Sequence, residues 1–141
     1  GLAAIGPLAL ERLRAAGLRP DSVGGLTLGA GPVSFAMALA SAQGGDPVRA
    51  FTVRKEAKVH GTGKLIEGPF AAGDRVVIIE DVITTGASAH RAILAVREAG
   101  GLVIGVLAVV DREEGGRESL SSTGVPVLAL TTISEILAQL P

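Results

Sequence analysis

One stretch decides the fold: Val76-Val77-Ile78-Ile79-Glu80-Asp81-Val82-Ile83-Thr84-Thr85-Gly86-Ala87-Ser88. Its first four residues are apolar and β-branched, which predicts a strand at residues 76–79 that is buried on both faces. Residues 87–99 then carry a helical pattern that ends at Gly100-Gly101. The stretch therefore reads as a strand, an acidic and hydroxyl-rich turn, and a helix.

Strand and helix patterns alternate along the rest of the chain. Short apolar runs predict further strands at residues 23–28, 48–53, 102–110 and 125–130. Helices are predicted at residues 2–18 and 33–42, more weakly at 115–122, and after a capping box at 132–135. Residues 54–74 are polar, Gly-rich and predicted to be irregular. The alternation predicts one α/β domain over residues 1–141, with a mainly parallel sheet flanked by helices on both faces.

Composition narrows the class of protein. The chain has 141 residues and is 48% apolar, which suits one domain around one core. A net charge of −1 gives no reason to expect nucleic acid as a partner. Cysteine is absent, so disulfides and thiolate metal sites are excluded. Residues 22–45 are uncharged, but Gly31-Pro32 would interrupt a membrane span, which favours a buried strand followed by a helix.

Polar residues follow the central predicted strand, where parallel sheets bind ligands. Small residues at the start of the next helix leave N–H groups free for a phosphate, and hydroxyls add donors. The carboxylates of Glu80 and Asp81 are suitable acceptors for the hydroxyls of a ribose. Ordinary N-caps would explain any one of these residues alone. The combination predicts a site for a sugar phosphate.

On these residues the chain resembles the phosphoribosyltransferase family, whose signature is a buried strand, two acids and a Thr/Gly-rich phosphate loop. The resemblance implies that the chain binds phosphoribosyl pyrophosphate (PRPP). The implied contacts to the ribose and 5′-phosphate are Glu80, Asp81, Val82, Ile83, Thr84, Thr85, Gly86, Ala87 and Ser88. It also implies Mg²⁺ as a cofactor that PRPP carries and that Glu80 or Asp81 contacts. The segment 61–64 lacks P-loop spacing, and 29–31 lacks the third glycine of a dinucleotide motif.

A basic loop follows the second predicted strand. Residues 54–64 read RKEAKVHGTGK and contain all three lysines of the chain. Lysine is a compact, flexible cation, unlike the arginine that the chain uses elsewhere. A solvated charged turn would account for these residues alone. Beside a phosphate site, they predict a mobile loop near residues 55–69 that stabilises a departing pyrophosphate.

The run RKEAKVHGTGKLIEG at residues 54–68 is similar to the mobile catalytic loop of orotate phosphoribosyltransferases. The resemblance implies pyrophosphate contacts from Arg54, Lys55, Lys58 and His60, and from the turn residues Ala30 and Gly31. Lys58 and Asp81 are the implied catalytic residues. The family also implies a homodimer in which loop 54–64 reaches the neighbouring active site. Gly31 stands where close relatives often have an acid, which leaves only the backbone for that contact. A plain tight turn at residues 29–32 is the alternative interpretation.

The strand predicted at 102–110 is followed by Asp111-Arg112. By resemblance, Arg112 holds the orotate carboxylate and Thr84 faces the base. A guanidinium suits a carboxylate through bidentate pairing. A polar strand end or a local ion pair between Asp111 and Arg112 is the alternative explanation.

The resemblance implies the reaction of orotate with PRPP to give orotidine 5′-monophosphate and pyrophosphate, in the cytoplasm. Two alternatives stay open: a phosphoribosyltransferase for another base, and a non-catalytic PRPP-binding regulatory protein. The family has some tens of residues before the position of Leu2, including a lysine and aromatic residues that face orotate. The expectation is that the sequence omits this segment.

We predict that Lys58→Ala lowers turnover at least tenfold, or ~1.4 kcal/mol, because the departing pyrophosphate loses a cation. Thermal unfolding should stay unchanged, since the side chain belongs to a polar loop. A pyrophosphate-release assay measures the first quantity and circular dichroism the second. Wild-type turnover in the variant would exclude a catalytic role for Lys58.

Overall fold

The computed structural model describes residues 1–27, 29–57 and 64–141. Within these residues, six strands form one sheet in the order β3-β2-β1-β4-β5-β6. The strands are β1 (Ser22–Leu26), β2 (Arg49–Val53), β3 (Ile66–Glu67), β4 (Arg75–Ile83), β5 (Leu102–Asp111) and β6 (Val127–Thr132). Neighbouring strands run parallel except β2 and β3. The predicted mainly parallel sheet is confirmed.

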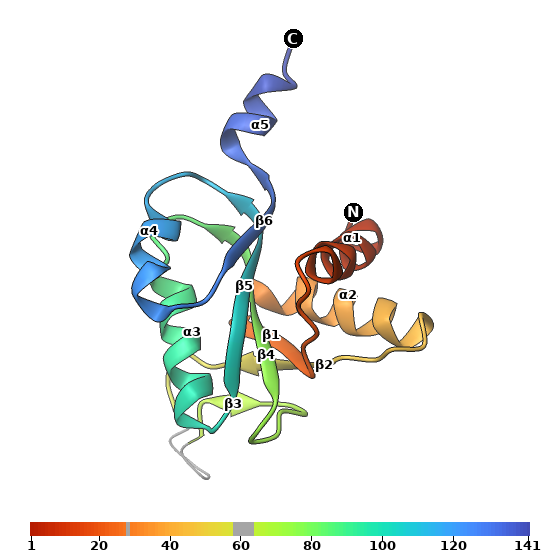
Figure 1. Ribbon diagram of the computed structural model, residues 1–141, viewed down its shortest axis with the longest axis vertical. Helices are drawn as coiled ribbons and strands as arrows, with labels where there is room; N and C mark the ends of the chain where they lie inside the picture. The colour runs from red at the N-terminus through yellow and green to blue at the C-terminus, as the bar shows by residue number, and fades with distance from the viewer. Residues whose placement is uncertain (28, 58–63) are drawn as a thin grey trace.

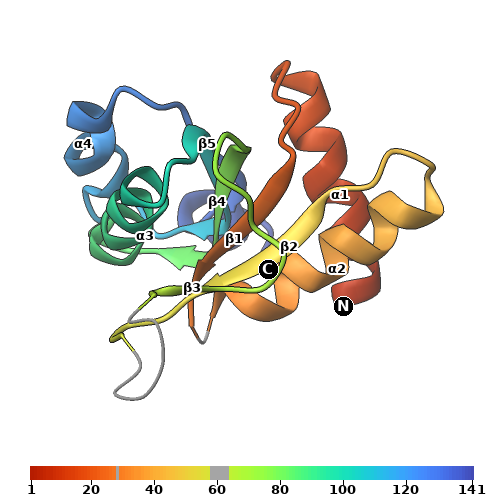
Figure 2. The same cartoon turned by 90° about the horizontal axis from the view of Figure 1, so that it is seen from below.

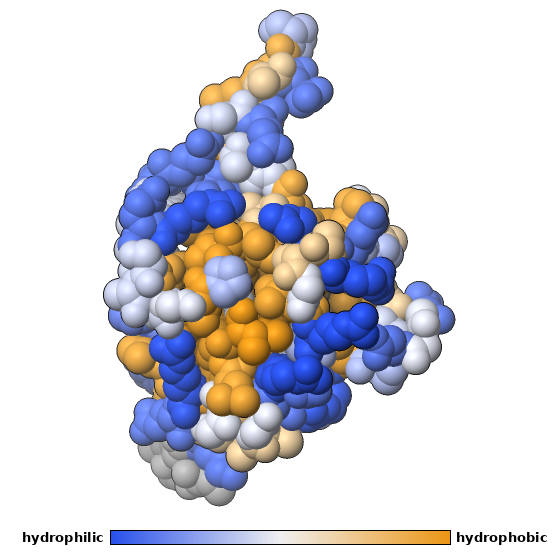
Figure 3. All heavy atoms as spheres, in the orientation of Figure 1, coloured by the Kyte–Doolittle hydropathy of each residue, from blue (hydrophilic) through white to orange (hydrophobic). Residues whose placement is uncertain are grey.

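Helices cover both faces of the sheet, as predicted (Figures 1 and 2). One face carries α1 (Leu2–Ala15) and α2 (Ala30–Gln43); the other carries α3 (Ala87–Glu98) and α4 (Gly116–Leu120), which continues into a 3₁₀ turn (Ser121–Thr123). The last helix, α5 (Ile133–Ala138), projects from the end of β6 and has no buried residue. Apolar surface spreads over the region where β5 and β6 lie (Figure 3), and Leu128 and Leu130 of β6 are partly buried there. No helix in the described parts of the chain is long and apolar enough to cross a membrane.

The central strand β4 is buried on both faces, as its apolar run predicts. Val76 and Ile78 belong to the core cluster beneath α3. Val77 and Ile79 belong to the second cluster, beneath α1 and α2. All four side chains are completely buried. Continued by two residues, the alternation directs Glu80 toward the α3 face and Asp81 toward the α2 face.

The structure corrects the predicted end of this strand. The acidic pair suggested an end at Ile79, but β4 continues to Ile83. Pairing with β5 sustains it, because Val82 lies opposite Val110 and Ile83 opposite Asp111. Glu80 and Asp81 are therefore strand residues with fixed directions.

The start of α2 and an additional short strand also differ from the prediction. Helix α2 begins at Ala30, three residues before the predicted start at 33, and Pro32 lies in its first turn. A proline is tolerated there because the first N–H groups of a helix have no partner within the helix. The short strand β3 lies in the segment predicted to be irregular and pairs with β2 through Val53 and Ile66. The other predicted elements each have a counterpart, and the capping box is confirmed by a 3.1 Å hydrogen bond from the Glu135 N–H to Thr132 Oγ1.

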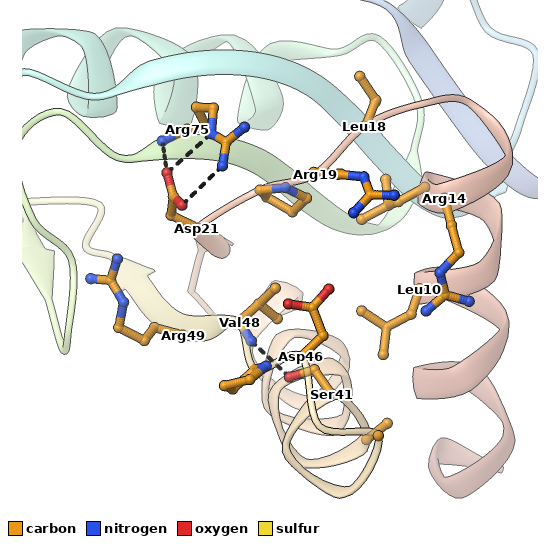
Figure 4. Close-up of a pocket in the computed structure, with 15 residues that line it drawn as sticks. Leu10, Arg14, Leu18, Arg19, Asp21, Ser41, Asp46, Val48, Arg49 and Arg75 are labelled. Carbon is orange, nitrogen blue, oxygen red and sulfur yellow. Dashed lines mark hydrogen bonds and ion pairs between the residues drawn. The ribbon is translucent and has the colours of Figure 1, made fainter.

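Ion pairs tie together the starts of the strands, beside a cavity of about 380 Å³ (Figure 4). The main-chain N–H of Arg75 donates to Asp21 Oδ2 at 2.8 Å, and its Nη2 lies 3.3 Å from Asp21 Oδ1. Hydrogen bonding from the Arg75 side chain is the main cause that lowers the pKa of Asp21. Arg49 Nη2 similarly lies 2.7 Å from Asp74 Oδ1. These pairs stabilise the end of the sheet at which the strands begin. Parallel sheets bind ligands at the opposite end, beside the carboxyl ends of the strands.

Strand β1 passes close to the end of β4 because it carries glycine at position 25. A Cβ on Gly25 would overlap the carbonyl oxygen of Ile79 and lie 2.8 Å from Ala30 Cβ. The absence of a side chain thus lets the start of α2 approach the end of β4. The two segments that carry candidate site residues meet there.

We predict that Gly25→Ala lowers the free energy of unfolding by about 1–3 kcal/mol, because the methyl group forces β1 and β4 apart. Gly44→Ala is the matched control: its Cβ would meet its nearest neighbour, Ala40 O, at 3.5 Å. The control should change stability by less than about 0.5 kcal/mol. Urea unfolding followed by circular dichroism measures both. Equal stability of the two variants would contradict the close contact.

Candidate functional site

An open cavity of about 220 Å³ lies at the end of β4. Its lining consists of Glu80 and residues 82–89, which include every predicted contact to the ribose and 5′-phosphate except Asp81. Gly86 is the N-cap of α3 with φ 90°, a left-handed conformation that favours glycine. Among the described residues, the N–H groups of Ser88 and Ala89 have no hydrogen-bond partner. The start of α3 can therefore accept a phosphate, as helix N-termini do.

Glu80 brings a buried carboxyl group to this cavity. The residue is 6% exposed, and within the described chain its Oε1 is the buried side-chain polar atom that lacks a hydrogen-bond partner. Burial, and secondarily the charge of Asp81, raise the pKa of Glu80 to about 7. A buried polar atom without a partner is costly unless a ligand supplies one. A ligand hydroxyl or a ligand-borne cation would satisfy Oε1.

Asp81 points to the other face of the sheet, toward α2. Strand alternation gives this direction. The packing agrees, since a Cβ on Gly29, the N-cap of α2, would overlap the Asp81 carboxylate. Asp81 is exposed, and its Oδ1 accepts the Val82 N–H at 2.8 Å. The carboxylate thus lies at the positive end of the α2 dipole.

The predicted pyrophosphate contacts Ala30 and Gly31 form the first turn of α2. Ala30 is buried, whereas a Cβ added to Gly31 would meet a first neighbour only at 3.9 Å. The open space beside Gly31 leaves the backbone of this helix start accessible. Two helix N-termini, of α2 and α3, consequently flank the end of β4, with Asp81 beside one and Glu80 beside the other.

Arg54 and Lys55 follow β2. Arg54 Nη1 forms an ion pair with Glu67 Oε1 at 2.9 Å, and the Lys55 side chain is exposed. The Lys55 carbonyl accepts a 2.8 Å hydrogen bond from Arg91 Nη2 on α3. The start of the basic loop is thus attached to the helix that begins at the phosphate cavity. The predicted residues Lys58 and His60 lie outside the described residues.

The predicted orotate contacts Thr84 and Arg112 are brought together by the sheet. Each follows the last pair of the β4–β5 register, and the Arg112 N–H donates to the Ile83 carbonyl at 3.0 Å. Asp111 does not pair with Arg112: its carboxylate accepts the Glu113 N–H at 2.8 Å and Arg117 Nε at 2.9 Å. The local ion pair considered from the sequence is therefore not formed between these two neighbours.

Sequence reasoning missed one residue that shapes the phosphate cavity. Ser119 on α4 donates its hydroxyl to the Thr85 carbonyl at 2.6 Å and also contacts the Gly116 carbonyl at 3.0 Å. The bond holds the turn before α3 against α4. The sequence around Ser119 predicts a weak helix and gives no sign of this main-chain acceptor.

The chain is similar to known proteins, although no family model matches it. Orotate phosphoribosyltransferase from Aquifex aeolicus is 52% identical over 118 residues, or 84% of this chain and 64% of that protein. Orotate phosphoribosyltransferase from Synechocystis is 48% identical over 138 residues, or 96% of this chain and 70% of that protein. The crystal structure of Mycobacterium tuberculosis orotate phosphoribosyltransferase in complex with PRPP matches with a TM-score of 0.81 and 40% identity, over 95% of this chain and 74% of that chain. The chain spans 64% to 74% of the length of these three relatives.

We predict that Glu80 makes stability depend on pH. Its pKa in the folded chain, about 7, exceeds the ordinary 4.5, so the stability it contributes is complete below pH 4.5 and is lost as the pH rises through 7. Glu80→Gln should remove this dependence and be more stable than the wild type at pH 8 by about 1–3 kcal/mol. Urea unfolding at pH 5 and pH 8, without substrate or Mg²⁺, measures the difference.

Glu11→Gln on the exposed surface of α1 is the control and should retain the wild-type pH dependence. A Glu80→Gln variant with the same loss of stability between pH 5 and pH 8 as the wild type would contradict the shifted pKa.

Proposed function

The chain belongs to the orotate phosphoribosyltransferase family, and from this membership we propose that it transfers the phosphoribosyl group of PRPP to orotate. The products are orotidine 5′-monophosphate, a precursor in pyrimidine biosynthesis, and pyrophosphate. One observation carries the proposal: two helix N-termini flank the end of β4, and an acid of that strand lies beside each. A substrate with phosphate groups at both ends of a ribose fits between them. The proposal places the enzyme in the cytoplasm.

In this proposal the start of α3 binds the 5′-phosphate through its N–H groups and through the hydroxyls of Thr84, Thr85 and Ser88. The start of α2, with Ala30 and Gly31, receives the pyrophosphate. The orotate nitrogen attacks the anomeric carbon while the bond to pyrophosphate breaks. Positive charge develops on the ribose, where Glu80 and Asp81 stabilise it.

Cations oppose the charge that grows on the leaving pyrophosphate. Arg54 and Lys55 follow the end of β2, and Lys58 and His60 come next in the same loop. Each positive charge stabilises the transition state more than it stabilises the bound substrate. These residues therefore accelerate the reaction itself.

The residues at the end of β4 fit a magnesium ion that arrives with the substrate. Mg²⁺ in phosphate sites is held by one or two carboxylates together with substrate oxygens. Glu80 Oε1 has no partner among the described residues, and Asp81 is exposed. When bound, the ion would neutralise charge on the pyrophosphate.

A second copy of the chain is part of the proposal. Helix α2 contains no charged residue, yet Phe35 and Leu39 on it are 56% and 63% exposed. A helix that is apolar on all sides is usually buried, so this surface favours contact with another apolar surface. We propose a homodimer through α2, in which loop 54–64 reaches the partner's active site.

A pyrophosphate-release assay with PRPP and Mg²⁺ tests the function with orotate, uracil, adenine and hypoxanthine. We expect pyrophosphate release with orotate and with none of the other three bases. Release with another base would establish the wider phosphoribosyltransferase activity. PRPP binding without release for any base would identify a regulatory protein instead.

We predict that Arg112→Ala raises the KM for orotate at least tenfold, because a charge-assisted hydrogen bond to a carboxylate contributes about 1.5–3 kcal/mol. The KM for PRPP and the thermal unfolding should change little, since the Arg112 side chain is 55% exposed. Arg19→Ala, an exposed arginine beside the distant cavity of Figure 4, is the control. An unchanged KM for orotate in Arg112→Ala would exclude the proposed contact between Arg112 and the orotate carboxylate.

A further inference from the structure

We propose that Glu114 sets the affinity for orotate, because it occupies the guanidinium of Arg112 before substrate arrives and competes with the orotate carboxylate. The inference rests on the proposed function. It concerns the loop between β5 and α4, which carries Arg112 beside the phosphate turn.

The main chain around Arg112 is held firmly. The Arg112 N–H donates to Ile83, and the buried carboxylate of Asp111 accepts the Glu113 N–H. Glu113, with φ 59°, directs its own carboxylate to the Ser134 N–H at 2.8 Å. Hydrogen bonds thus fix the backbone at residues 111–113. The part of this segment that can change conformation is the side chain of Arg112.

That side chain has an acidic neighbour. Arg112 Nε lies 3.0 Å from Glu114 Oε2, and within the described chain this is the ion pair that Arg112 forms. The two side chains are 55% and 50% exposed. An ion pair this exposed contributes little to stability, so a ligand can replace it at small cost.

Glu114 and orotate present the same chemical group to Arg112. A guanidinium gains most from one carboxylate bound by two parallel hydrogen bonds. While Glu114 stays charged beside Nε, an incoming carboxylate must either displace it or bind next to a like charge. Both routes weaken orotate binding relative to an arginine without this neighbour. Glu114 therefore lowers the affinity of Arg112 for orotate.

The test measures steady-state kinetics of Glu114→Gln. This variant keeps the shape of the side chain and removes its charge. We expect the KM for orotate to fall about two- to fivefold, within the energy of an exposed pair, while turnover and the KM for PRPP stay unchanged. Glu118→Gln on α4 is the matched control: it removes the same charge nearby and, within the described residues, Glu118 has no ion pair with Arg112. The control should leave the KM for orotate unchanged.

The same substitution in an Arg112→Ala background completes a double-mutant cycle, where Glu114→Gln should have no effect on orotate. An unchanged KM in the single variant overturns the inference. A raised KM also overturns it, because Glu114 would then orient Arg112 rather than compete for it. Turnover of orotate by the wild type with either of these results leaves the proposed function intact, whereas no turnover of orotate by the wild type overturns both.

Discussion

The pairing of β4 with β5 continues past the buried apolar run and into polar sequence, and the candidate site depends on this continuation. Because the register still holds at Ile83 and Asp111, Thr84 and Arg112 leave the sheet side by side. The same pairing keeps Glu80 and Asp81 in an extended strand, which sends their side chains to opposite faces. A loop at these positions would not fix either direction.

The candidate site also depends on the close approach of α2 to β4. Gly25 and Gly29 let α2 begin against β4, with its first turn next to Asp81. Helix α3 begins on the other side, after the turn that Ser119 holds. A substrate with two anionic ends would meet two helix starts there, and backbone N–H groups that the fold itself orients would accommodate much of its charge.

The sequence predicts the parts of this arrangement that have local causes. The β-branched run at 76–79, the helix after Gly86 and the capping box at Thr132 follow from residue type and spacing alone. The end of β4 does not, because two acids look like a strand end unless the partner strand is known to continue beside them. The two-residue strand β3 exists only through its non-local pairing with β2. The role of Ser119 was hidden for a similar reason, since its acceptor is a backbone carbonyl 34 residues away.

Glu113 links the loop that carries Arg112 to the last helix of the described chain. Helix α5 buries none of its residues, so its placement relies on its start, where Thr132 and Glu113 each accept an N–H. Glu113 reaches Ser134 from a left-handed backbone conformation that is uncommon outside glycine. The start of α5 is therefore coupled to the backbone next to Arg112 in two ways, through the Glu113 carboxylate and through the pairing of Asp111 with Thr132. A displacement of α5 would thus shift the backbone from which the Arg112 side chain projects.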